Sequence, residues 1–337
     1  MTDHFNKDSR QSDHFNAAMP MTAARTIALY RDFYETLSGK ADAPILPAGH
    51  ADDVRHIARL TDVIDDVDGF ILDSYGVIGL GSAPIDGIQS FFAAAAAKEK
   101  PIVILTNGAS QPAANRLPTY VGWDLPVVTS DIISSRDAAY HYLKEQAQNN
   151  PDLRLSYLCA NAVPFADLDG PVYGAQAASD FGYDWHQADV FCFMGATSWS
   201  ETAQQHLEEA LTATPHAKLL IANPDVSAPV GQGFSFEPGF WGMRARAATQ
   251  CALIMTGKPF QPAYGLAVDA LEKKAGKRLN KSKIAMVGDS LHTDILGAKT
   301  FGLTAVLLTD YGLLRGWDSN VITKQCQIFP DIICAKL

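Results

Sequence analysis

Residues 68–78 read DGFILDSYGVI and join a short apolar run to a carboxylate. The run 70–72 stops at Asp73, and Gly76 follows three residues later. This pattern is typical of a buried strand that carries a carboxylate to the carboxyl end of a parallel sheet, where ligands bind in open α/β folds. Because an aspartate before a turn is common by itself, its meaning depends on the other segments.

Similar strand ends recur along the chain. The apolar residues 101–105 run into Thr106-Asn107-Gly108, and residues 284–287 run into Gly288-Asp289-Ser290. Hydrophobic spacing and breakers predict helices over 51–67, about 84–98, 110–117, 262–275 and 292–301, and further strands at 127–128 and 304–309, before a polar end. Strands that alternate with helices predict an α/β fold with a doubly wound parallel sheet.

The middle of the chain has a different composition: proline, glycine and aromatic residues become frequent over 148–245. We expect strands at 154–159, 189–195 and 218–222 there, with a helix over about 200–212, and the sheet domain resumes with a helix near 243–256. This segment is predicted to be an inserted second α/β domain. The sheet domain then comprises residues 21–147 and 246–337, with a helix over 22–38, and residues 1–20 form a disordered tail.

Charge and cysteine content limit the partners and the compartment. The 337 residues carry a formal net charge of −10, which argues against nucleic acid or an anionic membrane as the main partner. A small phosphorylated metabolite stays compatible, since one pocket can be positive within an acidic surface. The five cysteines contain no C-x-x-C pair, which fits a reducing cytoplasmic setting.

Four segments supply the parts that phosphoryl transfer needs. A carboxylate such as Asp73 can attack phosphorus and form an aspartyl phosphate. Mg²⁺ prefers one or two carboxylates with water and phosphate oxygen, and Asp73 and Asp289 can provide two. Thr106, Asn107 and Lys258 offer a hydroxyl, an amide and an ammonium group for the remaining phosphate oxygens.

These segments resemble a known family. The sequences DSYGV (73–77), LTN (105–107), GKP (257–259) and GDSLHTDI (288–295) match, in order, the four motifs of the haloacid dehalogenase (HAD) superfamily. The G-D-x-x-x-T-D-I pattern, the tripeptide Asn223-Pro224-Asp225 and the insertion between motifs two and three resemble subfamily IIA, the NagD-like sugar and nucleotide phosphatases. The resemblance covers about residues 65–310.

The resemblance implies a role for each matching position. Asp73 is expected to be the nucleophile and a Mg²⁺ ligand, together with the main-chain carbonyl of Tyr75 and the carboxylate of Asp289. Lys258 would neutralise the nucleophile and the phosphate, and Asp294 would orient Lys258 or the waters of the metal.

The remaining expectations concern the substrate and the insert. Thr106 and Asn107 are expected to bind the transferring phosphoryl group, and Asn223 and Asp225 are candidate substrate contacts. The insert would be a cap that closes over the site and selects the substrate. Caps of this kind often pair, so a homodimer is one expected arrangement.

Tyr75 departs from the pattern. HAD phosphatases usually place a second aspartate at this position, two residues after the nucleophile, and it protonates the leaving oxygen. A phenol has an ordinary pKa near 10 and is a poor acid at neutral pH, and the loss of a positioned acid costs about 10²–10⁴ in rate. The alternatives are therefore a pseudo-phosphatase that binds or senses a phosphorylated ligand, and a haloacid dehalogenase, although the intact Gly288-Asp289 pair and the later insert argue against the dehalogenase.

Overall fold

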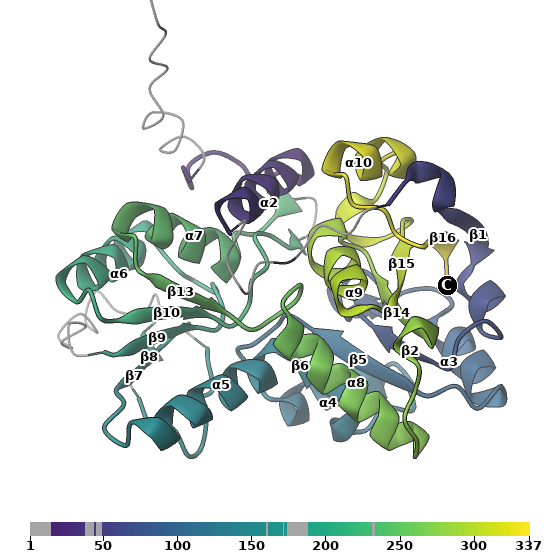
Figure 1. The fold of residues 1–337 in the computed structure, drawn as a ribbon, viewed down its shortest axis with the longest axis horizontal. Coiled ribbons are helices and arrows are strands. Elements are labelled where there is room, and N and C mark those ends of the chain that lie inside the picture. Colours follow the sequence, from purple (N-terminus) through teal and green to yellow (C-terminus); the bar gives the residue numbers. More distant parts are fainter. Residues whose placement is uncertain are drawn as a thin grey trace, which may run out of the picture.

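The computed structural model describes residues 15–37, 44, 49–159, 161–170, 172–173, 188–230 and 233–337. Two parallel sheets lie side by side, each with helices on both faces (Figure 1). The larger sheet contains, in spatial order, β1 (Arg55–Arg59), β16 (Ile332–Lys336), β15 (Thr304–Leu308), β14 (Ile284–Gly288), β2 (Gly69–Leu72), β5 (Ile102–Thr106) and β6 (Ile132–Ser134). The expected doubly wound parallel sheet is confirmed.

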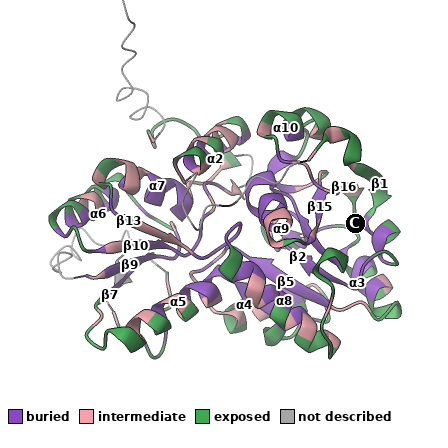
Figure 2. Cartoon of the chain, in the orientation of Figure 1, coloured by how far each residue is buried: buried purple, intermediate pink, exposed green. Residues whose placement is uncertain are grey.

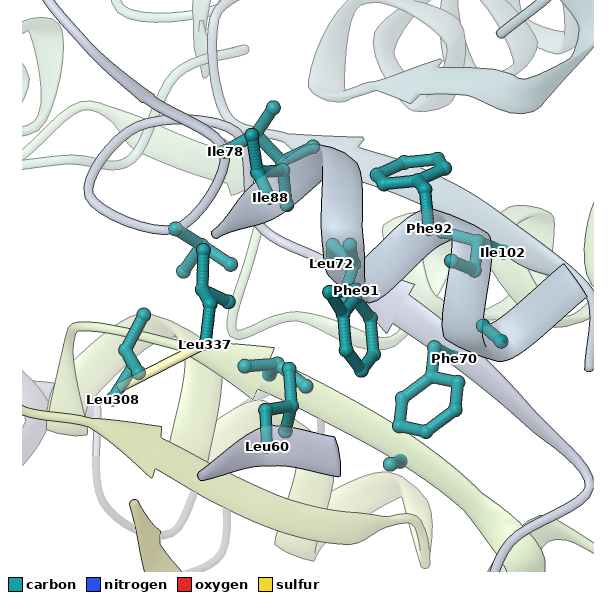
Figure 3. Close-up of a cluster of buried hydrophobic side chains, with 14 of the residues drawn as sticks. Leu60, Phe70, Leu72, Ile78, Ile88, Phe91, Phe92, Ile102, Leu308 and Leu337 are labelled. Carbon is teal, nitrogen blue, oxygen red and sulfur yellow. The ribbon is translucent and has the colours of Figure 1, made fainter. Parts of the chain in front are cut away.

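The larger sheet is covered by helices of the first and last thirds of the chain. They are α3 (Ile88–Ala97), α4 (Ala113–Gly122), α8 (Gln261–Ala275), α9 (Leu296–Phe301) and α10 (Ser319–Cys326). Alternating side chains of β2 face opposite layers: Phe70 and Leu72 join α3, whereas Ile71 joins α8. In Figure 3, Phe91 lies beside Phe70 and Leu72, and the Phe70 and Phe91 rings meet edge to face at 5.0 Å. This packing fixes β2, and with it the position of Asp73.

The smaller sheet is built from the insert and from the strand that follows it, β13. Its strands, in spatial order, are β13 (Ala252–Met255), β10 (Lys218–Ile221), β9 (Val190–Phe193), β7 (Leu155–Leu158) and β8 (Val172–Tyr173). The helices α6 (Glu201–Ala213) and α7 (Pro238–Thr249) cover one face. The helix α5 (Ser135–Asn149) covers the other face through Ala139 and Leu143. Figure 2 shows that β7, β9 and β10 are largely buried and that the edge strand β13 is partly exposed, as are the outer faces of the helices.

Short elements complete the described fold. Two antiparallel hairpins are β3 (Gly79–Leu80) with β4 (Ala83–Pro84), and β11 (Pro229–Val230) with β12 (Gly233–Phe234). Single turns of 3₁₀-helix are η1 (Ala51–Asp53), η2 (Leu60–Val63), η3 (Thr129–Asp131), η6 (Lys281–Lys283) and η8 (Gly312–Leu314), and η7 (Leu291–Ile295) is a π-helical turn. Within the described residues, no helix has the length and apolar character needed to span a bilayer.

Several predicted elements of the larger sheet are wrong. Residues 51–67 form η1, β1 and η2 instead of a helix, because residues 55–59 pair with the edge of β16, and pairing with a distant strand outweighs local helical spacing. The strand expected at 127–128 lies later, at β6. The polar end contains α10 and β16, which inserts between β1 and β15.

The smaller sheet includes or contacts segments on both sides of residues 148–245. Residues 252–255 form strand β13 of the smaller sheet instead of the end of a helix, so that sheet extends past residue 245. Helix α5 packs on the smaller sheet although most of it precedes residue 148.

The described part of the N-terminal segment packs against the smaller sheet. Residues 1–14 of the predicted tail lie outside the described residues. In the remainder, the Phe15 and Phe240 rings lie 5.8 Å apart and Arg25 donates to the oxygen of Asn16 at 2.9 Å, so residues 15 and 16 contact other parts of the fold. Helix α2 (Ala23–Leu37) follows, and its Leu29 and Phe33 pack in the core of the smaller sheet.

Candidate active site

The predicted site residues meet at the carboxyl edge of the larger sheet. The neighbouring strands β14, β2 and β5 deliver Asp289, Asp73 and Thr106, respectively. A hydrogen bond of 2.9 Å from the Asp73 N–H to the oxygen of Val287 holds two of these strand ends together. Carboxylate oxygens of Asp73, Asp289 and Asp294 all lie within 4.8 Å of one another. The carboxylates of residues 73 and 289 therefore approach one point, which the prediction of a shared cation requires.

Lys258 connects Asp73, the candidate nucleophile, to Asp294 of the fourth motif. Its Nζ atom lies 2.5 Å from Oδ1 of Asp73 and 2.7 Å from Oδ1 of Asp294, and the side chain is only 2% exposed. Burial opposes the charge of Lys258, but the carboxylates of Asp294 and Asp73 outweigh it and raise its pKa. Asp294 also accepts the N–H of Ser290 at 3.1 Å. With both of its oxygens engaged, Asp294 is suited to orient Lys258.

The charges of this cluster fit a divalent cation. The cluster contains three carboxylates and one ammonium group, which contacts Asp73 and Asp294, so full ionisation leaves an excess negative charge that a bound cation can balance. Burial, followed by the repulsion of neighbouring carboxylates, raises the pKa of Asp289 well above its ordinary value. The Ser290 hydroxyl is a buried polar group without a hydrogen-bond partner among the described residues. These donors match the hard oxygen ligands that Mg²⁺ prefers.

Two glycines allow the chain to approach Asp289. Gly76 has a φ of +80°, and a Cβ atom there would lie 2.2 Å from Oδ2 of Asp289. Gly312 has a φ of +73°, and its Cβ atom would lie 1.8 Å from the same oxygen. The Leu313 N–H donates to this oxygen at 2.8 Å. Larger residues would therefore push these turns away from the carboxylate.

Tyr75 is turned toward the insert. Its hydroxyl donates to the main-chain oxygen of Pro229 in β11 at 2.5 Å. The residue lines a cavity of about 50 Å³ together with Asp73, Lys258 and Asp289. Burial raises the pKa of Tyr75, which makes the phenol an even weaker acid than usual.

Thr106 and Asn107 occupy different surroundings. The Thr106 hydroxyl accepts the Gly108 N–H at 3.2 Å, which leaves its proton for another acceptor. The Asn107 amide nitrogen donates to Asp225 Oδ1 at 2.7 Å and to the Lys258 oxygen at 3.1 Å, while its oxygen accepts from Ser135 Oγ and the Lys258 N–H, both at 2.7 Å. An amide offers two donors and two acceptor positions. The side chain is therefore saturated, and only the main chain of Asn107 remains for the expected phosphoryl contact.

Asn223 and Asp225 of the tripeptide 223–225 also differ in their surroundings. Asp225 lines the cavity that contains Asp73, and burial raises its pKa to about 6 although Lys258 and Asn107 lower it. Asn223 does not line this cavity; its Oδ1 accepts the Asp225 N–H at 3.0 Å and holds the turn. The expectation that both residues contact substrate is thus supported in geometry for Asp225 alone.

Sequence reasoning missed a wall of the cavity that comes from helix α2. Tyr30 lines the cavity, and its hydroxyl accepts the Val226 N–H at 3.0 Å. The Tyr30 ring stacks on His292 at 5.0 Å, and burial lowers the pKa of His292 to about 3, so the imidazole is neutral. The Tyr34 hydroxyl donates to the His292 oxygen at 2.8 Å. Helical spacing predicted α2, but nothing in its sequence indicates which surface its tyrosines contact.

Comparisons with known proteins agree with this geometry. A family model described as haloacid dehalogenase-like hydrolase matches residues 70–161, and a HAD-hydrolase-like model matches residues 255–313. An acid sugar phosphatase of Staphylococcus haemolyticus is 23% identical, over 71% of this chain and 83% of that protein. Phosphoglycolate phosphatase 2 of Arabidopsis thaliana is 27% identical, over 80% of this chain and 90% of that protein.

Solved structures share the fold. A possible sugar phosphatase from Cytophaga hutchinsonii aligns with a TM-score of 0.68 and 23% identity, covering 83% of this chain and 97% of its own. NagD from E. coli aligns with a TM-score of 0.55 and 20% identity, covering 80% and 96%. A glycerol phosphate phosphatase from Mycobacterium tuberculosis in complex with magnesium aligns with a TM-score of 0.55 and 23% identity, covering 73% and 69%. From its ordered motifs, its matching family models and this shared architecture, the chain belongs to the haloacid dehalogenase superfamily, in the NagD-like subfamily IIA of phosphoric monoester hydrolases.

Proposed function

We propose that this protein is a Mg²⁺-dependent phosphatase that hydrolyses a small phosphorylated metabolite, such as a sugar phosphate or a nucleotide, through an aspartyl phosphate on Asp73. The observation that carries the proposal is the contact of Lys258 with both Asp73 and Asp294, beside Asp289 in one buried cluster. Such a cluster combines a nucleophile, a fixed cation and an excess of negative charge for a metal. The insert, with α5 and β13, would act as the cap.

The carboxylates of Asp73 and Asp289 and the main-chain oxygen of Tyr75 would hold the metal. Bound there, Mg²⁺ would neutralise phosphate charge and keep Asp73 ionised. The magnesium complex of the related glycerol phosphate phosphatase supports this choice of ion.

The residues of the chain would perform the transfer itself. An Asp73 carboxylate oxygen attacks phosphorus, the bond from phosphorus to the leaving oxygen breaks, and the phosphoryl group is held on Asp73. Lys258 neutralises both the attacking carboxylate and the phosphoryl oxygens from its position 2.5 Å from Asp73. The Thr106 hydroxyl and the Asn107 N–H would bind the phosphoryl oxygens, while the Asn107 side chain positions Lys258 and Asp225.

The proton for the leaving oxygen would come from Asp225. Tyr75 already donates its proton to Pro229. Asp225 lines the same cavity as Asp73, only Oδ1 has a hydrogen-bond partner among the described residues, and burial raises its pKa to about 6. Protonated Asp225 would give its proton to the leaving oxygen. The resulting carboxylate would then take one from the water that hydrolyses the aspartyl phosphate, which restores both residues.

A substrate panel with Mg²⁺ tests the proposal. We expect the wild type to hydrolyse p-nitrophenyl phosphate and, more slowly, alkyl phosphates, and Asp73→Asn to abolish both activities. Asp269→Asn, an exposed aspartate of α8, is the control for folding and charge. Hydrolysis by Asp73→Asn at the wild-type rate would overturn the nucleophile assignment.

The same panel separates the alternatives. Binding of phosphate ligands without hydrolysis of any ester would instead indicate a pseudo-phosphatase, which the bond from Tyr75 to Pro229 makes the main competing function. Release of halide from a 2-haloacid would indicate a dehalogenase. Association into a homodimer stays a prediction, which light scattering would check.

A further inference from the structure

A larger cavity adjoins the proposed reaction site. It has a volume of about 200 Å³ and lies between α4 and the β3–β4 hairpin. Tyr75 lines both this cavity and the small cavity that contains Asp73. Ser74, directly after the nucleophile, lines it as well, and its hydroxyl lies 2.7 Å from that of Tyr120. A group attached to a phosphate at Asp73 therefore has a short path into this cavity.

Arg116 is the cation of this cavity. Its side chain lies directly against the phosphoryl-binding loop: a Cβ atom on Gly108 would be 2.5 Å from an Arg116 guanidinium nitrogen. Among the described residues, the guanidinium donates only to the oxygen of Gln111, at a long 3.4 Å. An arginine offers five donors, so several remain available to a ligand.

No carboxylate within the described chain neutralises this guanidinium. None of the residues that line the cavity is acidic. Asp137 is near enough to influence Arg116, but one of its oxygens already accepts the N–H and the hydroxyl of Ser134, each at 2.8 Å. Burial lowers the pKa of Arg116, which is the effect of removing a cation from water without a paired anion. Arg116 is a half-buried cation without a paired carboxylate among the described residues, and such a cation favours an anionic ligand.

We propose that Arg116 forms an anion subsite, and that the preferred substrates are short phosphate monoesters whose alcohol carries a second anionic group, a carboxylate or another phosphate. This inference rests on the proposed phosphatase function and specifies its substrate class. The planar guanidinium can bind either anion through two parallel hydrogen bonds. Because the subsite adjoins the turn after the nucleophile, the second anion must be separated from the phosphate by few atoms.

A matched pair of esters tests the subsite. Phosphoglycolate and 2-hydroxyethyl phosphate have similar length but differ in the terminal carboxylate. We expect the wild type to prefer phosphoglycolate in kcat/KM, mainly through KM, and Arg116→Gln to lower this preference roughly 10- to 100-fold, as the loss of hydrogen bonds to a charged group predicts. Arg116→Lys should restore part of the preference. A second pair of substrates, a bisphosphate and the monophosphate that lacks its second phosphate, tests in the same way whether Arg116 binds a phosphate.

A control variant separates local from general charge effects. Arg59→Gln removes an exposed arginine from β1, at the opposite edge of the sheet, and should leave the preference unchanged. If Arg116→Gln lowers kcat/KM equally for both esters, the subsite is overturned, because Arg116 would then bind the phosphoryl group itself.

Binding of non-hydrolysable ligands distinguishes failure of the subsite from failure of the phosphatase proposal. By calorimetry with Mg²⁺, 3-phosphonopropionate should bind the wild type roughly 10- to 100-fold more tightly than propylphosphonate, and Arg116→Gln should remove the difference. Equal affinities of the wild type for the two ligands would overturn the subsite even if p-nitrophenyl phosphate is hydrolysed. A clear difference without hydrolysis of any ester would support the subsite and overturn the phosphatase proposal.

Discussion

The Tyr75 hydroxyl donates a hydrogen bond to the main-chain oxygen of Pro229 at 2.5 Å. This bond joins the first motif to the β11–β12 hairpin of the insert. A side chain that replaces the usual proton donor is thus used to hold the proposed cap against the reaction site. The departure in sequence has a structural consequence as well as a chemical one.

Restoring the carboxylate should separate these two roles. We expect Tyr75→Asp to raise kcat for alkyl phosphates by about 10- to 100-fold, since a positioned acid contributes about 10²–10⁴ and Asp225 would already supply part of it. Tyr75→Phe removes the bond to Pro229 without supplying an acid and serves as the control. Steady-state kinetics on alkyl and aryl phosphates would measure both variants; an equal gain in Tyr75→Phe would show that cap release, and not proton donation, limits the wild type.

The pH profile should identify the proton donor. Burial raises the pKa of Asp225 to about 6, so its carboxyl is protonated below that pH and ionised above it. Because the acid must be protonated, kcat for alkyl phosphates should fall about tenfold per pH unit above pH 6. Asp225→Asn should remove this fall of kcat above pH 6. It should also slow the hydrolysis of alkyl phosphates more than that of p-nitrophenyl phosphate, whose leaving group needs little protonation. An unchanged fall in Asp225→Asn would assign the proton to another group.

Metal binding should be visible without turnover. The cluster of Asp73, Asp289 and Asp294 carries excess negative charge, so Mg²⁺ should raise the melting temperature of the wild type. At a concentration of one hundred times Kd the stabilisation is about 2.7 kcal/mol. Asp289→Asn should lose most of the Mg²⁺-induced shift in differential scanning fluorimetry, whereas Asp269→Asn on the exposed face of α8 should keep it. A full shift in Asp289→Asn would place the metal elsewhere.

Local signals were sufficient for much of the fold and the site. Apolar runs that end in polar residues identified β2, β5 and β14, and the parallel arrangement then required Asp73, Thr106 and Asp289 to share one edge. The resemblance to the family motifs implied that Lys258 lies beside Asp73, and its Nζ atom lies 2.5 Å from Oδ1 of Asp73.

Features that depend on distant partners were not predictable from local sequence. Residues 55–59 form a strand only because β16 is present beside them. The Asn107 amide faces Asp225, a residue of the insert, so its sequence position next to Thr106 did not reveal that its hydrogen bonds are already used. The same limit explains why α2 was predicted as a helix but not as a wall of the site.

Helix α2 yields the last prediction, because it connects the two halves of the site. The Tyr30 hydroxyl accepts the N–H of Val226, a residue of the insert, at 3.0 Å. The Tyr30 ring stacks on His292, which follows strand β14 of the larger sheet. We expect Tyr30→Phe to leave the buried Val226 N–H without a partner, at a cost of about 1–3 kcal/mol. Hydrogen exchange of residues 223–230 should therefore accelerate and the melting temperature should fall. Tyr142→Phe, at a half-buried tyrosine of α5 far along the chain from residues 223–230, is the matched control and should change neither quantity. If exchange over residues 223–230 stays slow in Tyr30→Phe, the insert is held by other contacts, and α2 contributes only packing to the site.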